Sequence, residues 1–476
     1  MKYETVIGLE VHVELATQTK IFCGCENKFG GAPNTHCCPV CIGMPGVLPV
    51  LNEKAVEYAV RAGLATNCTI AHFSKMDRKG YYYPDLPKAY QISQFDLPIC
   101  KGGWVDIQTG DAQKRIRLTR IHMEEDAGKL LHDTGTGTAV DYNRGGVPLI
   151  EIVTEPDLRS AEEARVFLET LKSILKYTGV SDCKMQEGSL RCDVNISVRE
   201  AGSDVFGTRT EMKNLNSFSA VFRAIESESA RQIALLEDGG KVKQQTRRFD
   251  DAKGKSFAMR GKEEAHDYRY FPDPDLVPIT LTQQRIDGIR NSLPELPTAK
   301  KQRYIEKLGL SEYDAGVLTS EYEIAAFFEA CLSLYENPKK ICNLITSDLL
   351  RLLKEDNIAP EDNPAHPSHV AEALMLVDSG QVNITVAKAV FEEAFRTGEK
   401  PGDIVSSKGL AQISDAEHIR ALLREVITNN PGPVADYKGG KQKALTFFVG
   451  QVMKATKGQA NPQVVNTIAR EELDKA

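Results

Sequence analysis

The segment GLEVHVEL, residues 8–15, alternates apolar and polar side chains along its whole length. Successive side chains of a β-strand point to opposite faces of a sheet, so the pattern predicts a strand whose leucines and valines share one face. Glu10, His12 and Glu14 would then line the other face, each about 7 Å from the next. Such a face is either an ordinary solvated surface or a functional surface of carboxylate and imidazole groups.

Similar alternation recurs in three later segments, RIRLTRIHM (115–123), PLIEIVTE (148–155) and CDVNISVR (192–199). These segments are typical of strands in a mostly antiparallel sheet. In the first of them the apolar parity slips between Leu118 and Ile121, which predicts a β-bulge of the kind that often re-aims side chains near active sites. Apolar residues recur at helical spacing over 161–179 and 219–240, and both segments end in glycine, a common helix stop.

The pattern changes after LPELPT (293–298), where amphipathic helical signals replace strand signals and Ser311 is a predicted helix N-cap. The aromatic, proline-rich stretch HDYRYFPDPDLVP (266–278) is predicted to be an ordered loop. A second change falls near PGDIVSSKG (401–409). We therefore predict an α+β fold with a mostly antiparallel-sheet domain over 1–292, a cysteine-rich knuckle at 23–41, a helical domain over 293–405 and a helical tail module over 406–476.

The composition is that of an ordinary globular protein, with 41% hydrophobic residues, 26% charged residues and a formal net charge of −7. The acidic balance argues against a general nucleic-acid binder, so any such contact is expected to be local. No apolar run approaches the ~20 residues that a membrane span requires. The N-terminus MKYETVIGLE lacks the basic start and apolar core of a signal peptide, and we expect a cytoplasmic protein.

Acidic side chains recur on or beside the other predicted strands: Glu124, Glu125, Asp126, Glu151, Asp193 and Glu211. Carboxylates that converge repel one another unless a cation neutralises them. Oxygen-rich sites with at most one imidazole suit Mg²⁺ or Mn²⁺, and Mg²⁺ with few protein ligands is typically shared with substrate phosphates. The residues thus favour phosphoryl chemistry, with Arg144, Arg191 and Lys213 as partners for anionic oxygens. Neither a Walker A loop nor a G-x-G-x-x-G after a strand is present.

Five of the eleven cysteines fall within residues 23–41. The pairs Cys23-x-Cys25 and Cys38-x-x-Cys41, separated by a Gly/Pro/Asn loop, are typical of a structural zinc site, although the first pair is one residue closer than usual. The alternatives are a redox-active CPVC motif or unbound thiols.

Several longer motifs together resemble one family. They are GLEVHVEL, RKGYYYPDLPKAYQISQ (78–94), HMEEDAGK (122–129), VDYNRGGVPLIEIV (140–153), RCDVNISV (191–198), EMKNLNSF (211–218), HDYRYFPDPDL and GQVMKATKGQANP (450–462). They are similar to the B subunit of the tRNA-dependent aspartyl/glutamyl amidotransferase, over essentially the whole chain. The resemblance implies that ATP phosphorylates the side-chain carboxylate of misacylated Glu-tRNA(Gln) or Asp-tRNA(Asn), and that ammonia then displaces the phosphate.

The resemblance also implies roles for individual residues. It implies a magnesium site formed by Glu10, His12, Glu125 and Glu151, with Glu124, Asp193 and Glu211 as further candidates. Lys213 and Asn214 would hold the phosphate or acyl phosphate, in addition to Arg144 and Arg191 proposed above from their charge. The chain lacks a Gly-Ser-Ser-rich amidase signature, which fits a separate glutaminase A subunit and a small C subunit.

Two further sets of residues follow from the same resemblance. The segment with Lys79, Tyr81, Tyr82, Asp85 and Lys88 is similar to the side of the family's ammonia tunnel, although a tyrosine-rich turn packed on the sheet is the alternative. Residues 437–470 carry six basic and no acidic side chains, namely Lys438, Lys441, Lys443, Lys454, Lys457 and Arg470. Lysines mainly contact phosphates, so this tail is predicted to bind tRNA, with a solvated helical surface as the alternative.

Two other functions are compatible with these residues. One is a non-catalytic tRNA-binding scaffold whose acidic face is merely solvated. The other is an independent metal-dependent phosphohydrolase, which would release phosphate without tRNA or any partner protein.

Overall fold

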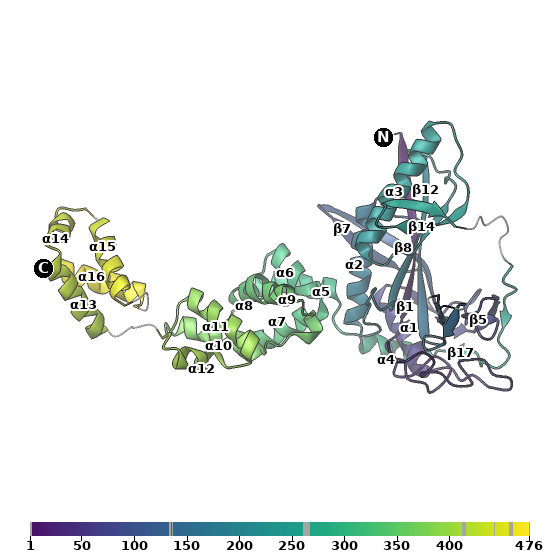
Figure 1. The fold of residues 1–476 in the computed structure, drawn as a ribbon, viewed down its shortest axis with the longest axis horizontal. Coiled ribbons are helices and arrows are strands. Elements are labelled where there is room, and N and C mark those ends of the chain that lie inside the picture. Colours follow the sequence, from purple (N-terminus) through teal and green to yellow (C-terminus); the bar gives the residue numbers. More distant parts are fainter. Residues whose placement is uncertain are drawn as a thin grey trace. The chain divides into compact units, whose positions relative to one another are not determined.

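The computed structural model describes residues 2–132, 135, 137–259, 267–411, 416–441, 443–456 and 460–475. Its contacts divide the chain into two compact units, residues 1–297 and 298–476 (Figure 1). The first unit contains the sheets, and the second is helical. The fold is therefore α+β, as predicted, whereas the three-part domain division stays a prediction.

The first unit is built on a ten-stranded sheet in the order β15-β14-β13-β12-β1-β11-β8-β6-β2, with β7 also paired to β8. Its strands are β1 (Tyr3–Glu14), β2 (Thr69–Ile70), β6 (Cys100–Lys101), β7 (Trp104–Thr109), β8 (Ala112–Glu125), β11 (Pro148–Thr154), β12 (Leu190–Glu200), β13 (Thr210–Lys213), β14 (Gln245–Asp250) and β15 (Lys255–Ala258). Among the described pairings in this sheet, β13 with β14 is parallel and the others are antiparallel.

The strand containing GLEVHVEL lies at the centre of this sheet. Leu9, Val11 and Val13 are buried in the main core. They pack in one cluster with residues of α1 (Glu53–Ala65), α2 (Ala161–Tyr177) and α3 (Phe218–Glu237), which lie along the sheet in Figure 1. The side-chain oxygens of Ser160 and Ser217 cap α2 and α3 by accepting from backbone N–H groups of the first turn. The polar side chains of β1 therefore lie on the opposite face of the sheet from this core.

The predicted bulge in β8 is confirmed. Val153 is the partner of Arg120, whereas the next residue, Thr154, is the partner of Leu118, so Thr119 is the extra residue. A bulge leaves one residue unpaired and changes which side chains share a face. Beyond the bulge, the side chains of His122 and Glu124 come to lie with the polar side chains of β1.

The first unit also contains three smaller sheets among the described residues. They are β16 (Phe271–Pro272) with β4 (Asp77–Gly80) and β5 (Tyr90–Ser93), β9 (Lys129–Leu131) with β10 (Ala139–Asp141), and β3 (Phe73–Ser74) with β17 (Ile279–Thr280). The stretch predicted as a loop over 266–278 therefore includes a short strand, because Phe271 pairs with Arg78; its first residue lies outside the described ranges. Helix α4 (Gln283–Asn291) ends this part of the chain.

The second unit consists of helices, in line with the loss of strand signals after residue 298. They are α5 (Pro297–Leu308), α6 (Glu312–Thr319), α7 (Tyr322–Leu334), α8 (Pro338–Leu344), η1 (Ile345–Leu349), α9 (Leu350–Glu355), η2 (Pro360–Asp362), α10 (Pro367–Asp378), α11 (Ile384–Thr397), α12 (Pro401–Ser407), α13 (Ala416–Asn429), α14 (Pro431–Lys438), α15 (Lys443–Ala455) and α16 (Pro462–Lys475). Ser311 is the N-cap of α6, as predicted, and its hydroxyl accepts from Asp314 N at 3.0 Å. Within the described ranges, none of the helices combines the length and apolar character needed to cross a membrane.

Candidate active site

Four neighbouring strands place a row of ionisable side chains on the polar face of the central sheet. His12 on β1 is the cross-strand partner of Arg191 on β12 and of Glu151 on β11. Glu151 is in turn the partner of His122 on β8. Glu151 therefore lies between two imidazoles, with its Oε2 at 3.6 Å from His12 Nε2 and 3.3 Å from His122 Nε2.

Glu124 completes this group. Its Oε1 lies 3.8 Å from His12 Nε2, and its Oε2 lies 3.6 Å from His122 Nε2. One potential ligand atom from each of His12, Glu124 and Glu151 lies within 4.8 Å of the other two. One imidazole and two carboxylates form a donor set that suits Mg²⁺ or Mn²⁺ better than a softer metal. We call these three residues the imidazole–carboxylate group.

Protonation of the imidazoles balances the buried carboxylates. Burial opposes the charged form of His122, but hydrogen bonds with Glu124 and Glu151 outweigh it and raise the pKa of His122 to about 9. The same balance raises the pKa of His12. Burial also opposes the charge of Glu151, yet its hydrogen bonds with the two imidazoles hold the pKa of this carboxyl well below its usual value. A bound cation would replace the positive charge that these protons supply.

Glu10 lies in a second acidic group, two residues along β1. Potential ligand atoms of Glu10, Asp193 and Glu211 lie within 4.8 Å of one another. Lys213 Nζ lies 2.8 Å from Asp193 Oδ2 and 3.1 Å from Glu211 Oε1. Burial alone would lower the pKa of Lys213, but the two carboxylates reverse this effect and raise it. The structure therefore separates Glu10, Asp193 and Glu211 from the imidazole–carboxylate group.

Both groups contribute to one cavity of about 380 Å³. Its lining includes His12, Glu124, Glu151, Arg191, Asp193 and Lys213 from the central sheet, and Lys79, Tyr81, Asp85, Gln91 and Tyr268 from segments outside that sheet. Cationic and anionic side chains thus face a space large enough for a phosphate-bearing ligand. We call this space the acidic cavity.

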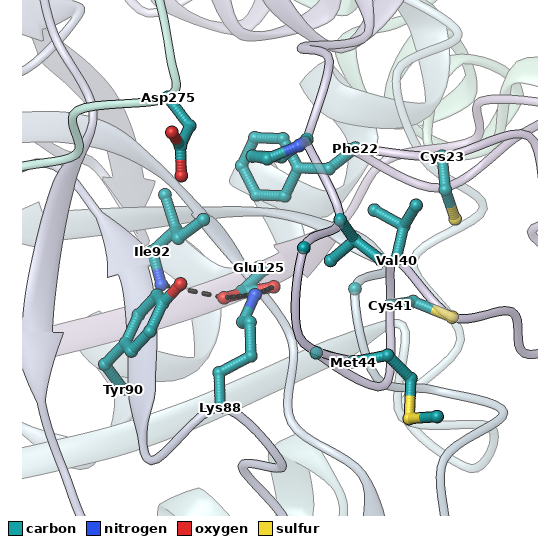
Figure 2. A pocket seen from close by; sticks show the side chains of 15 residues that line it. Phe22, Cys23, Val40, Cys41, Met44, Lys88, Tyr90, Ile92, Glu125 and Asp275 are labelled. Carbon is teal, nitrogen blue, oxygen red and sulfur yellow. Dashed lines mark hydrogen bonds and ion pairs between the residues drawn. The ribbon is translucent and has the colours of Figure 1, made fainter.

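Glu125 does not join either acidic group. Side chains of consecutive strand residues point in opposite directions, so Glu125 faces away from its neighbour Glu124. Its two carboxylate oxygens each lie 2.6 Å from Lys88 Nζ, and Oε1 also accepts from Ile92 N at 2.8 Å. Lys88 and Glu125 line a different cavity of about 210 Å³, with Cys41 and Met44 of the cysteine-rich loop across from them (Figure 2). We call this second space the cysteine-loop cavity.

Strand β5 and the end of β8 separate the two cavities. Gln91 of β5 lines the acidic cavity, whereas its neighbour Ile92 lines the cysteine-loop cavity. Gln91 Nε2 donates to Glu125 O at 2.9 Å, which ties the two strands together. The partition is therefore one layer of backbone, with the Lys88–Glu125 ion pair on one side and Glu124 on the other.

The remaining predicted residues are spread around these two spaces. Tyr82 is 79% exposed, whereas Tyr81 of the same segment is 40% exposed and lines the acidic cavity. Arg144 donates to Ala127 O and Gly128 O at 2.9 and 3.0 Å, so its guanidinium is engaged with backbone. Asn214 lines a separate space at the start of α3, beside Ser217.

His122 was assigned no role from the sequence, and Asp126 was named only among the acidic side chains beside the predicted strands. Asp126 lines the acidic cavity, and its Oδ2 accepts from Arg191 Nη2 at 2.6 Å, which fixes this arginine at the cavity wall. The segment IHMEED places His122 and Glu124 two residues apart, so strict alternation after the bulge could have indicated His122.

The cysteine-rich loop brings four thiols together. The Sγ atoms of Cys23, Cys25, Cys38 and Cys41 lie within 4.8 Å of one another. Tetrahedral zinc with Zn–S bonds of ~2.3 Å places its sulfurs ~3.8 Å apart, so the cluster fits a structural zinc ion. The hydrogen bond with Cys23 lowers the pKa of Cys41 to about 4 against the opposing effect of burial. The zinc itself stays a prediction.

The basic tail residues lie in or beside the last helices. Lys438 ends α14, whereas Lys443 and Lys454 lie on α15 and are exposed. Lys441 Nζ is paired with Asp436 Oδ1 at 2.8 Å, and Lys457 lies outside the described residues.

Comparison with known protein families assigns both parts of the chain to a class. Residues 5–287 match the GatB/GatE catalytic domain family. This range contains the imidazole–carboxylate group, the second acidic group and the cysteine-rich loop. Residues 326–473 match the family described as the GatB domain. The chain belongs to the GatB family, so the resemblance of its motifs is confirmed.

Full-length relatives agree with this assignment. The chain is 62% identical to the B subunit of the aspartyl/glutamyl-tRNA(Asn/Gln) amidotransferase of Caldicellulosiruptor saccharolyticus over 100% of both chains. It is 59% identical to the B subunit of the same enzyme from a Thermoanaerobacter species, again over 100% of both chains. The identity to the B subunit from Persephonella marina is 54%, over 99% of this chain and 100% of that one.

Proposed function

We propose that this chain is the kinase and transamidase subunit of a cytoplasmic, tRNA-dependent amidotransferase. Its substrates would be Glu-tRNA(Gln) and Asp-tRNA(Asn), its phosphoryl donor ATP, and its partners a glutaminase A subunit and a small C subunit. The observation that carries the proposal is the imidazole–carboxylate group, which lies in one cavity with Arg191 and Lys213. Family membership supports the tRNA-dependent amidation role.

The proposed chemistry follows from the poor reactivity of a carboxylate toward nucleophiles. Transfer of the terminal phosphoryl group of ATP to the side-chain carboxylate forms an acyl phosphate and ADP. The nitrogen of ammonia then attacks the acyl carbon, the C–O bond to phosphate breaks, and the nitrogen loses a proton to leave an amide. Phosphate is a far better leaving group than oxide.

The residues of the acidic cavity fit these steps. Magnesium bound by His12, Glu124 and Glu151 would offset the charge of the transferring phosphoryl group. Arg191, held by Asp126, and Lys213, held by Asp193 and Glu211, would neutralise further phosphate oxygens. The second acidic group, with Glu10, remains a further candidate metal site.

The arrangement of the two cavities supports a route for ammonia. We assign the cysteine-loop cavity to the side that receives ammonia and the acidic cavity to the side that uses it. Lys88 and Glu125 line the first space, whereas Lys79, Tyr81 and Asp85 line the second. In this assignment the Lys88–Glu125 ion pair controls passage through the partition, and the four-cysteine cluster with zinc shapes the entrance.

The proposal is tested by reconstituting the chain with candidate A and C subunits. ATP, glutamine and Glu-tRNA(Gln) together are expected to yield Gln-tRNA(Gln), with no product when any one is omitted. Amidation without ATP would overturn the kinase role. Phosphate release from ATP by this chain alone would favour the phosphohydrolase alternative, and full activity after Glu151→Gln would favour the scaffold alternative.

A further inference from the structure

A row of five aromatic rings borders the acidic cavity. The rings of Phe95 and Tyr270 stack with centroids 4.3 Å apart and an angle of 11° between their planes. Tyr270 meets Tyr268 edge to face at 6.1 Å, Tyr268 meets Tyr81 at 6.2 Å, and Tyr81 stacks on Tyr83 at 6.1 Å. The row therefore extends over four ring-to-ring steps, which is longer than a single nucleobase requires.

The Tyr268 and Tyr81 side of the row lies at the site. Tyr81 and Tyr268 line the acidic cavity together with His12, Glu124 and Glu151. Tyr270 joins this part of the row through its edge-to-face contact with Tyr268. The row thus leads from the proposed reaction centre to the surface.

The Phe95 end of the row is open. Phe95 is 59% exposed although its inner face stacks on Tyr270. Its backbone is fixed, because Phe95 N donates to Asp77 Oδ2 at 3.0 Å on β4. A large aromatic side chain held at the surface presents a π-face to solvent, an arrangement that proteins use to stack bases of single-stranded nucleic acids.

A cation accompanies the rings. Lys79 Nζ lies 4.9 Å from the centre of the Tyr268 ring and also lines the acidic cavity. Aromatic side chains that alternate with positive charge are the combination that binds single strands without reading their sequence. A row of rings suits consecutive bases of a strand, whereas the adenine of ATP would need one ring.

We propose that Phe95, Tyr270 and Tyr268 form a stacking platform for the unpaired bases at the acceptor end of the tRNA, which guides the attached amino acid into the acidic cavity. This inference rests on the proposed function, because it takes a misacylated tRNA as the substrate. In this proposal the three aromatic residues bind the acceptor end of the tRNA. The basic tail, which is predicted to hold the body of the tRNA, is a separate contact.

The direct test measures stacking on the full-length chain. A tRNA with a fluorescent adenine analogue as its terminal base is titrated with wild-type protein and with the variants Phe95→Leu and Tyr270→Leu. We expect quenching by the wild type, and a loss of quenching with a dissociation constant raised roughly fivefold or more in both variants. Phe95→Tyr and Tyr270→Phe keep the rings and are expected to behave as wild type. Tyr313→Leu replaces a ring that is 78% exposed in the other unit, and it is the matched control.

Further measurements on the complex with the A and C subunits separate the alternatives. We expect the leucine variants to raise the KM for misacylated tRNA and to leave the KM for ATP unchanged. A rise in the KM for ATP alone would assign the rings to the nucleotide, and loss of the A subunit on purification would assign them to a protein interface; either result overturns the platform. If the wild type quenches the fluorescence but its complex does not amidate the tRNA, the proposed function is refuted and the stacking platform is kept. If the complex amidates the tRNA but the leucine variants quench as well as the wild type, the platform is refuted and the proposed function is kept.

Discussion

His12 and Glu151 are cross-strand partners on β1 and β11, with His12 Nε2 at 3.6 Å from Glu151 Oε2. Their segments are more than a hundred residues apart in the chain, and the antiparallel register alone brings them together. A register shift of one residue would turn one of the two side chains into the apolar core. The pair thus links the alternation of GLEVHVEL to the chemistry of the site.

Glu151→Gln tests the role of this pair in cation binding. The amide keeps the shape of the side chain but removes the charge that faces both imidazoles, so we expect ATP-dependent amidation to fall by roughly 100-fold or more. The magnesium concentration needed for half-maximal activity should rise in the residual activity. A variant with normal activity and an unchanged magnesium requirement would exclude the imidazole–carboxylate group as the metal site.

The neighbours Glu124 and Glu125 offer a matched pair of substitutions, because they face different cavities. We expect Glu124→Gln to reduce formation of ADP that depends on Glu-tRNA(Gln), since Glu124 belongs to the imidazole–carboxylate group. Glu125→Gln should instead reduce glutamine-dependent amidation more than amidation supported by added ammonium salt. Parallel assays with the two nitrogen donors measure the difference, and identical profiles for both variants would contradict the division between the cavities.

Lys20 connects the cysteine-rich loop to the segment VDYNRGG. Its buried ammonium donates to Gly145 O at 2.7 Å and to Tyr142 O at 3.2 Å, and it lies 3.7 Å from Cys41 Sγ. We expect Lys20→Met to lower the free energy of unfolding by about 1–3 kcal/mol, because two carbonyls lose their partner. The zinc content of the purified protein should also fall, as the positive charge beside the thiolates is lost. Lys28 is an exposed residue in the same loop. The control variant Lys28→Met should therefore retain the wild-type free energy of unfolding and zinc content.

Glu228 on α3 is expected to make the free energy of unfolding depend on pH in the acidic range. This buried carboxylate accepts hydrogen bonds from Arg231, Thr210 and Ser256. Burial opposes its charge, but Arg231 and the other donors outweigh it, so the pKa lies below its ordinary value of 4.5. A depressed folded-state pKa stabilises the protein above the unfolded-state pKa, and this stabilisation is lost as the pH falls through the folded-state value.

Glu228→Gln is therefore expected to reduce the free energy of unfolding by about 3 kcal/mol at neutral pH, since it leaves the buried Arg247, whose Nε lies 3.2 Å from Glu228 Oε2, without its charged partner. Denaturant unfolding from pH 7 down to pH 3 should show the difference from wild type shrinking below about pH 4.5. A difference that stays constant over this range would show that the charge of Glu228 is not the cause.

Much of this protein follows from local patterns in its sequence. The alternation of GLEVHVEL determined which side chains of β1 are buried, because the covalent geometry of a strand sends neighbours to opposite faces. The slip of parity near Leu118 indicated the bulge in β8 for the same reason. Cysteine spacing indicated a four-thiol cluster, because short pairs within one loop stay close whatever the rest of the chain does.

Only the tertiary structure decided which distant groups meet. The sequence places Glu124 and Glu125 side by side, yet the first lies with His12 and Glu151 whereas the second is paired with Lys88. Likewise, Glu10 joins Asp193 and Glu211 instead of its near neighbour His12. Strand order and register set these partnerships, and both depend on hydrogen bonds and core packing between segments far apart in the chain, which local alternation does not contain.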